Sequence, residues 1–339
     1  MAQGLYLYEN ELHVQLSVNR KDTLDKSMKK LLIYGLVAVV VMVVLATVGG
    51  SCYMLDFALM PKEGRGDTAA RYQEQFDTYP ETRLWVDSLR SREALRDTFV
   101  TMPNGERHHA LYVNKGSSRT AVIVHGWRDC AIDFLYLARI YEQLLGYNVV
   151  MPDLHAHGLS EGDRIQMGWL DRKNVLHWLS LFQQDTMVVH GVSMGAATTM
   201  MLSAEPLPKG IKDIRFVEDC GYTSAWDEFA HEMKRQFGLP SFPLLHMANM
   251  LCQWRYGWSF RQASALDQVK RCRQPMLFIH GGSDAFVPTE MVYRLYDAKP
   301  SKRELWVTEG TVHAESYKNY KEEYIRRIRK AVQIDQGSK

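Results

Sequence analysis

The stretch Val188-Val189-His190-Gly191-Val192-Ser193-Met194-Gly195-Ala196-Ala197 decides the fold of this chain. A β-branched run enters a Gly-x-Ser-x-Gly pattern, and small, helix-compatible residues follow it, which predicts a strand, a tight turn and a helix. Such a turn holds the Ser193 hydroxyl clear of the sheet and is crowded enough to require glycine on both sides. Because chance produces this pattern in about one chain in ten of this length, the rest of the chain must supply the partners that a nucleophilic serine needs.

Length and composition indicate a globular protein with a substantial core. The chain has 339 residues, of which 46% are hydrophobic and 24% charged, and its formal net charge is +2. These values fit one large domain or two small ones, and the absence of a long basic face argues against a nucleic-acid partner. The cysteines lack the spacing of a metal site, so we expect no metal and no cofactor. We expect free, buried thiols, with a Cys252–Cys272 disulfide as the alternative.

An apolar segment near the N-terminus predicts a membrane anchor. No charged residue lies between Lys30 and Asp56, and about 20 such residues span a bilayer as a helix. We therefore place residues 31–52 in the lipid bilayer. Basic residues precede this segment, and the positive-inside rule then puts residues 1–30 in the cytoplasm and the rest of the chain outside it. The basic residues are Arg20, Lys21, Lys26, Lys29 and Lys30.

A cleaved signal sequence is the alternative interpretation of this segment. If Met28 is the true start, Met-Lys-Lys and the apolar run resemble a secretory signal, and Gly49-Gly50-Ser51-Cys52 resembles a lipoprotein cleavage site. The protein would then be secreted or lipid-anchored. Gly49, however, stands where such sites usually carry a large aliphatic residue, and the run is longer than the roughly 7–15 residues of a signal. An uncleaved single-pass anchor is favoured.

The chain after the anchor predicts a helical linker and one α/β domain. Residues 53–94 are polar, with a helix at 69–89 interrupted near Pro80. Residues 95–335 begin with a hairpin around Asn104-Gly105 and continue as short apolar strands alternating with helices. This alternation predicts a mostly parallel sheet with helices on both faces. The expected parallel strands lie at 121–124, 148–151, 186–189, 214–217, 276–279 and 304–307.

Candidate catalytic residues follow these strands, at the edge where parallel sheets gather their active groups. Asp284 lies in a Gly-rich turn after 276–279, and His313 follows 304–307. In enzymes whose nucleophilic serine lies on a turn between a strand and a helix, the nucleophile, the acid and the base follow one another in this order along the chain. Ser193, Asp284 and His313 have the same order. Asp219, at the end of the strand 214–217, is the rival acid.

Several motifs together make residues 95–333 similar to the α/β-hydrolase superfamily. The closer resemblance is to a membrane-anchored bacterial branch related to serine aminopeptidases and prolyl-oligopeptidase-like hydrolases. It is carried by Met167-Gly168-Trp169-Leu170, Glu218-Asp219-Cys220-Gly221-Tyr222-Thr223-Ser224, Gly257-Trp258-Ser259-Phe260 and Tyr53-Met54-Leu55-Asp56-Phe57-Ala58-Leu59.

The resemblance implies roles for two loops. His125-Gly126-Trp127 resembles the oxyanion loop, which assigns the two backbone donors to Trp127 and Met194. The loop 153–162 resembles D-x-R-G-H-G-x-S-x-G, with His155 and Ala156 in place of Arg and Gly. His157 belongs to this loop and is interpreted as structural.

An aromatic insertion at about 222–262, between two strands, is expected to form a cap. Its Tyr222, Trp226 and Trp258, with Phe286, are candidate pocket residues, although for each single position packing of the cap on the domain is the favoured explanation. We expect a serine hydrolase that cleaves esters of small acyl or aromatic substrates. The alternatives are a peptidase of the aminopeptidase or dipeptidyl-peptidase type, an acyltransferase with the same residues, or a catalytically silent tethered binding protein. The substrate is then a small molecule or a peptide, and the sequence does not reveal the oligomeric state.

Overall fold

The structure is a computed structural model that describes the backbone of residues 2–332 and the side chains of Arg20 and residues 23–332. The chain divides into two compact units, Met1–Tyr53 and Met54–Lys339. Helix α1 (Ala2–Leu59) makes up the first unit, and its last residues, from Met54 on, belong to the second.

Helix α1 is long and apolar enough to cross a membrane. Within Thr23–Leu59, an 18-residue window has a mean hydropathy of 2.9, and none of it is buried inside the protein. Since a helix rises 1.5 Å per residue, about 20 residues cross the hydrocarbon core of a bilayer. The helix is consistent with the anchor expected at residues 31–52.

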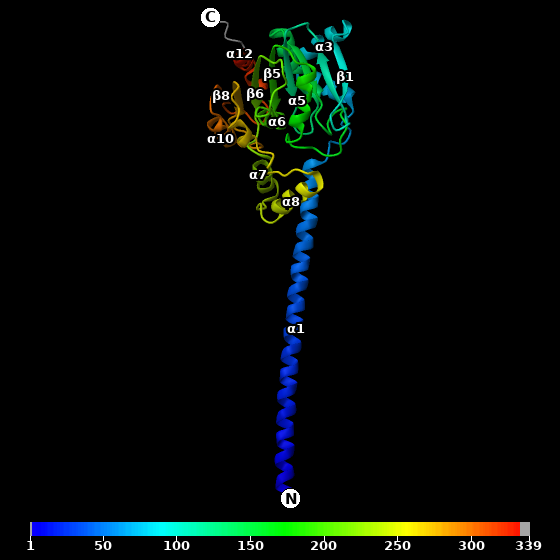
Figure 1. The fold of residues 1–339 in the computed structure, drawn as a ribbon, viewed down its shortest axis with the longest axis vertical. Helices are drawn as coiled ribbons and strands as arrows, with labels where there is room; N and C mark the ends of the chain where they lie inside the picture. Colours follow the sequence, from blue (N-terminus) through cyan, green and yellow to red (C-terminus); the bar gives the residue numbers. More distant parts are fainter. Residues whose placement is uncertain (1, 333–339) are drawn as a thin grey trace. The chain divides into compact units, whose positions relative to one another are not determined.

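The second unit is built on one eight-stranded sheet (Figure 1). Its strand order is β1-β2-β4-β3-β5-β6-β7-β8, in which β2 is antiparallel to both neighbours and the strands from β4 to β8 are parallel. The hairpin and the mostly parallel sheet predicted from the sequence are confirmed. The strands are β1 (Leu95–Thr101), β2 (Arg107–Val113), β3 (Arg119–Val124), β4 (Asn148–Pro152), β5 (Thr186–Val192), β6 (Asp213–Asp219), β7 (Met276–Gly281) and β8 (Arg303–Thr308).

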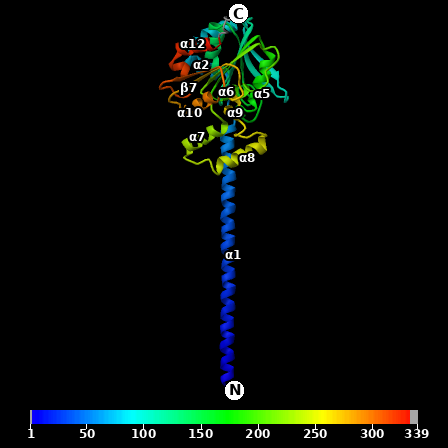
Figure 2. The ribbon, with the colours of Figure 1, turned by 60° about the vertical axis from the view of Figure 1, so that its left-hand side comes forward.

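Helices cover both faces of the sheet, because the strands direct apolar side chains to both faces and each face must be shielded from water. In β3, Val122 and Val124 belong to one hydrophobic cluster while Ala121 and Ile123 belong to the other, as the two-residue period of a strand requires. Figure 2 shows α5 and α6 on one face and α2 and α12 on the other. The helices and short helical turns, apart from α1 and the two of the cap, are α2 (Thr68–Thr78), α3 (Glu81–Ser91), η1 (Ala131–Phe134), α4 (Leu135–Arg139), η2 (Ile140–Leu144), α5 (Asp171–Leu181), α6 (Met194–Leu202), α9 (Ala265–Val269), α10 (Glu290–Ala298), α11 (Ser316–Asn319) and α12 (Lys321–Val332).

The segment between α1 and the sheet packs on the domain. Helices α2 and α3 are separated at Pro80, and Phe76, Trp85 and Leu89 are buried in the same cluster as one face of the sheet. The segment called a linker from the sequence is therefore part of the domain core.

Two helices, α7 (Ala225–Phe237) and α8 (Leu244–Tyr256), lie in the insertion expected at about 222–262, and α9 follows them before β7. The Ser224 hydroxyl accepts from the Asp227 N–H at 3.0 Å and caps the start of α7. Gly238 and Gly257 end the two helices at φ 65° and 76°, a left-handed conformation that glycine adopts without cost. Figure 1 shows this pair set apart from the sheet.

Candidate active site

Ser193 occupies a strained turn between β5 and α6. Its φ of 56° and ψ of −119° lie in a region that non-glycine residues rarely adopt. A Cβ atom on Gly195 would overlap the carbonyl oxygens of Val124 and His125, and one on Gly191 would overlap the carbonyl of Gly195. Gly195 is therefore required for the turn to pass this close to β3, and Gly191 for β5 to pass this close to α6.

The structure brings Ser193, His313 and Asp284 together, although 120 residues separate the first two. His313 Nε2 lies 2.9 Å from Ser193 Oγ, and His313 Nδ1 lies 2.7 Å from Asp284 Oδ2. Asp284 follows β7 and His313 follows β8, so neighbouring parallel strands place the two side chains at one edge of the sheet. The geometry is that of a nucleophile, a base and a carboxylate that orients the base.

The Asp284 carboxylate is fixed and ionised. Its Oδ1 accepts from the Phe286 and Val287 amides, both at 2.9 Å, and His280 Nε2 lies 3.4 Å from Oδ2. Burial alone would raise the pKa of Asp284, but the hydrogen bonds from His280 and His313 more than offset it and lower the pKa to about 2. The group keeps its negative charge throughout the neutral pH range.

Asp219, the rival acid, lies in a different hydrogen-bond network. Its Oδ2 accepts from the Tyr324 hydroxyl at 2.8 Å, and the same hydroxyl lies 3.1 Å from His190 Nε2. Burial raises the pKa of Asp219 to about 6. The geometry thus favours Asp284 as the partner of His313.

Trp127 and Met194, the expected oxyanion donors, flank Ser193. A Cβ on Gly126 would lie 3.6 Å from the Ser193 Cβ, which places the loop after β3 against the nucleophile. In the part of the chain that the structure describes, neither the Trp127 nor the Met194 amide donates to a protein acceptor. Both are therefore free to bind an oxygen of a substrate.

His157 holds the loop after β3 by accepting a hydrogen bond from its backbone. Its Nδ1–H donates to the His155 carbonyl at 2.8 Å, so Nε2 is free to accept the Arg128 N–H at 3.2 Å. Burial lowers the pKa of His157 well below its usual value, which keeps the ring neutral and able to accept. His157 therefore holds the loop after β3 through the Arg128 backbone.

The four aromatic residues expected at the pocket lie in different surroundings. The Phe286 ring centroid is 5.0 Å from that of His313, so this side chain borders the site. Tyr222 and Trp258 are almost completely buried in the hydrophobic core. Trp226 packs against His246 and under the Arg261 guanidinium at 3.6 Å.

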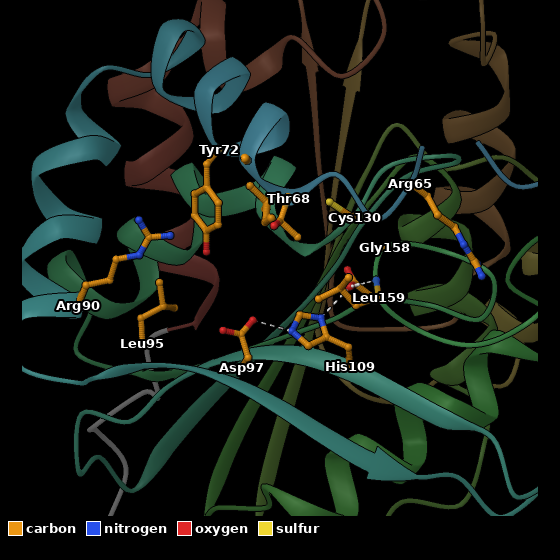
Figure 3. A pocket seen from close by; sticks show the side chains of 13 residues that line it. Arg65, Thr68, Tyr72, Arg90, Leu95, Asp97, His109, Cys130, Gly158 and Leu159 are labelled. Atoms are coloured by element: carbon orange, nitrogen blue, oxygen red, sulfur yellow. Dashed lines mark hydrogen bonds and ion pairs between the residues drawn. The ribbon is translucent and has the colours of Figure 1, made fainter. Parts of the chain in front are cut away.

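A separate cavity of about 530 Å³ lies between α2, the β1–β2 hairpin and the loop after β4. Figure 3 shows Tyr72 and Arg90 on one wall and Asp97 and His109 on the facing one. His109 bridges Asp97 Oδ1 (3.0 Å) and Asp153 Oδ2 (2.7 Å); burial would lower the pKa of His109, but the two carboxylates raise it. This ion bridge fixes the edge strands to the loop 153–162, and the cavity contains no member of the Ser193 site.

Among the residues that the structure describes, two clusters combine donors of the kinds that metals bind. Glu106 Oε2 accepts from His155 Nδ1 at 2.7 Å and lies 3.1 Å from His108 Nε2. The contact between His155 and Glu106 joins the loop 153–162 to the segment just before β2. The second cluster adds Cys220 to Asp284 and His313, with Cys220 Sγ 4.0 Å from His313 Nε2.

Cys220 is not a competing nucleophile in this arrangement. Burial and three neighbouring carboxylates raise the pKa of its thiol well above the usual value, and the thiolate is the reactive form. All five cysteines are free thiols, as expected, so the alternative Cys252–Cys272 disulfide is not formed.

Sequence reasoning missed two features of the site. The end of α1 contacts the loop after β3: the Trp127 indole Nε1–H donates to the Ala58 carbonyl at 2.9 Å. His109 ties β2 to Asp153. Neither contact has a sequence signal, because no motif marks the residues that it joins, 44 and 69 positions apart.

Comparison with known proteins supports the fold. No family model matches the chain. An uncharacterized Bacillus subtilis protein, YqkD, is 29% identical over 214 residues, which make up 62% of this chain and 69% of that protein. An esterase from Pyrococcus furiosus matches with a TM-score of 0.55 at 23% identity, covering 70% of this chain and 90% of the esterase. An esterase from Exiguobacterium antarcticum matches with a TM-score of 0.52 at 15% identity, and the match covers 70% of this chain and 99% of that esterase.

These likenesses to solved structures support the fold described above. The resemblance to the branch related to serine aminopeptidases stays a prediction. The chain has the α/β-hydrolase fold.

Proposed function

We propose that this protein is a membrane-anchored serine hydrolase that cleaves ester bonds of small acyl or aromatic substrates through an acyl-enzyme on Ser193. The observation that carries the proposal is the chain of hydrogen bonds from Ser193 to His313 to Asp284. An alcohol side chain is a weak nucleophile until a base accepts its proton, and His313 Nε2 is within reach of that proton.

Acylation follows from this geometry. His313 Nε2 takes the Ser193 proton as Oγ attacks the ester carbonyl carbon, and the carbonyl oxygen becomes an oxyanion between the Trp127 and Met194 amides. Each such donor lowers the barrier by about 3 kcal/mol. The imidazolium of His313, stabilised by Asp284, then protonates the departing alkoxide, and the alcohol leaves.

Deacylation repeats these steps with water. His313 accepts a proton from the water molecule as its oxygen attacks the acyl carbon, and the oxyanion forms in the same place. Collapse of this intermediate breaks the bond to Ser193 Oγ, which recovers its proton from His313. The products are an alcohol and a carboxylic acid, and no redox step or cofactor is needed.

The side chains around His313 are suited to a substrate with an apolar acyl or aromatic group. The Phe286 ring borders the imidazole and offers an apolar, aromatic surface beside it. Ester hydrolysis is therefore placed before aminopeptidase activity.

Turnover of model substrates tests whether ester hydrolysis is faster than peptide-bond cleavage. Full-length protein in detergent should hydrolyse p-nitrophenyl esters, with kcat/KM varying with acyl chain length, and should hydrolyse aminoacyl- and dipeptidyl-p-nitroanilides more slowly. Faster turnover of the anilides would show a peptidase and reverse the order.

We also propose that the catalytic domain lies outside the cytoplasm. The basic residues from Arg20 to Lys30 precede the apolar part of α1, which predicts a cytoplasmic N-terminus. Protease added to spheroplasts should digest the domain, with a cytoplasmic marker protein intact as the control. Full protection of the domain until the membrane is broken would refute this orientation.

A further inference from the structure

The last turn of α1 is docked into the catalytic unit. Leu55 and Leu59 are buried in the core, with at most 1% of each exposed. A helix leaves its last four carbonyls without intrahelical partners, and in a buried place these need donors from elsewhere. One donor is the Ile165 N–H, which binds the Leu59 carbonyl at 2.8 Å.

The other donors come from the oxyanion loop. The Trp127 indole Nε1–H donates to the Ala58 carbonyl at 2.9 Å. The Arg128 guanidinium donates to Phe57 through Nη2 at 2.9 Å and to Met60 through Nε at 3.2 Å. A cation at a helix C-terminus also interacts favourably with the helix dipole.

These contacts act on a strained part of the loop. Arg128 has a φ of 61°, and its guanidinium lies 4.2 Å from the centre of the Trp127 ring. The Arg128 backbone N–H donates to His157 Nε2. A non-glycine residue keeps such a conformation only where its surroundings hold it, and here the end of α1 and His157 together do so.

We propose that Met54–Met60, directly after the predicted membrane span, is a positioning element of the active site: by binding the side chains of Trp127 and Arg128, it holds the Trp127 amide where the oxyanion forms. The inference rests on the proposed function. It predicts that catalysis depends on hydrogen bonds whose acceptors belong to the anchor helix and never touch the substrate. A displacement of about 1 Å at such a donor lowers the rate by up to about 100-fold.

Two substitutions in the full-length protein test this. Trp127→Phe removes the indole donor but keeps an aromatic, though smaller, side chain and the backbone amide, and Arg128→Gln removes the contacts to Phe57 and Met60. Each should lower kcat for an ester about 10- to 100-fold, with KM nearly unchanged. A trifluoromethyl ketone, which forms an oxyanion on Ser193, should lose affinity by the same factor as kcat/KM. Titration with a fluorophosphonate counts the folded, active fraction in each preparation, so that a misfolded variant is not mistaken for a slow one.

Arg164→Gln is the matched control. Arg164 Nη2 pairs with Asp56 at 3.5 Å on the same end of α1, but it lies outside the oxyanion loop. This variant should keep kcat and the inhibitor affinity of the wild type. If Trp127→Phe and Arg128→Gln also keep both, the positioning role is refuted while the hydrolase proposal stands. A wild-type protein that the fluorophosphonate does not label refutes both.

Discussion

Ser193→Ala is expected to abolish ester hydrolysis and covalent labelling by a fluorophosphonate. Removing the nucleophile of a serine triad lowers kcat on the order of 10⁶-fold, because the remaining groups have no atom to transfer the acyl group to. The substitution removes one oxygen atom from a side chain whose hydrogen bond runs to His313. The fold should survive, since alanine fits a site where the backbone turn, and not the hydroxyl, fixes the path of the chain.

The measurement is gel-based labelling of the purified full-length protein together with kcat for p-nitrophenyl acetate. Ser180→Ala, at an exposed position in α5, is the control and should label like the wild type. A Ser193→Ala protein that labels as strongly as the wild type would show that another residue is the nucleophile. A wild type that binds esters without turnover would favour the tethered binding protein.

The sheet and its order of functional loops could be predicted because they depend on local pattern. The strands are short apolar runs whose alternate residues enter different hydrophobic clusters, as Val122 and Ile123 do in β3. The turn at Ser193 was predictable because only glycine fits at positions 191 and 195.

The docking of α1 could not be predicted, because a membrane and a protein core select the same side chains. Leu55 and Leu59 continue the apolar run of the anchor, yet they are buried in the domain. The sequence favoured Asp284 over Asp219 only through the Gly-rich turn around Asp284, since both residues follow parallel strands. The direction in which each carboxylate points is set by long-range contacts, such as that between Tyr324 and Asp219.

Asp284→Asn is expected to lower kcat about 10⁴-fold. An asparagine cannot both accept from His313 Nδ1–H and stabilise the imidazolium that forms when Ser193 loses its proton. The folded protein should also lose stability at neutral pH. The pKa of Asp284 falls from an ordinary 3.8 to about 2, so its ionised form contributes about 2 kcal/mol above pH 4, which is lost as the pH falls through 2.

Asp219→Asn is the matched control: it should change kcat little and should stabilise the folded protein at neutral pH. Its amide oxygen can still accept from the Tyr324 hydroxyl, and His313 keeps its own partner, so kcat should stay within about tenfold of the wild type. Burial raises the pKa of Asp219 from 3.8 to about 6, so the ionised form destabilises the folded protein by up to about 3 kcal/mol above pH 6. The variant should therefore have a higher Tm than the wild type at pH 7.5 and the same Tm near pH 4, where Asp219 is protonated.

The pair of variants separates catalysis from stability. A loss of activity in Asp284→Asn that came only from unfolding would disappear when kcat is divided by the fraction of protein that remains folded at the assay temperature. The stabilised Asp219→Asn protein offers the converse comparison, because a large loss of kcat in a protein of higher Tm has no explanation in unfolding. That result would identify Asp219 as the acid and overturn the assignment of Asp284, whatever the distances between Asp284 and His313.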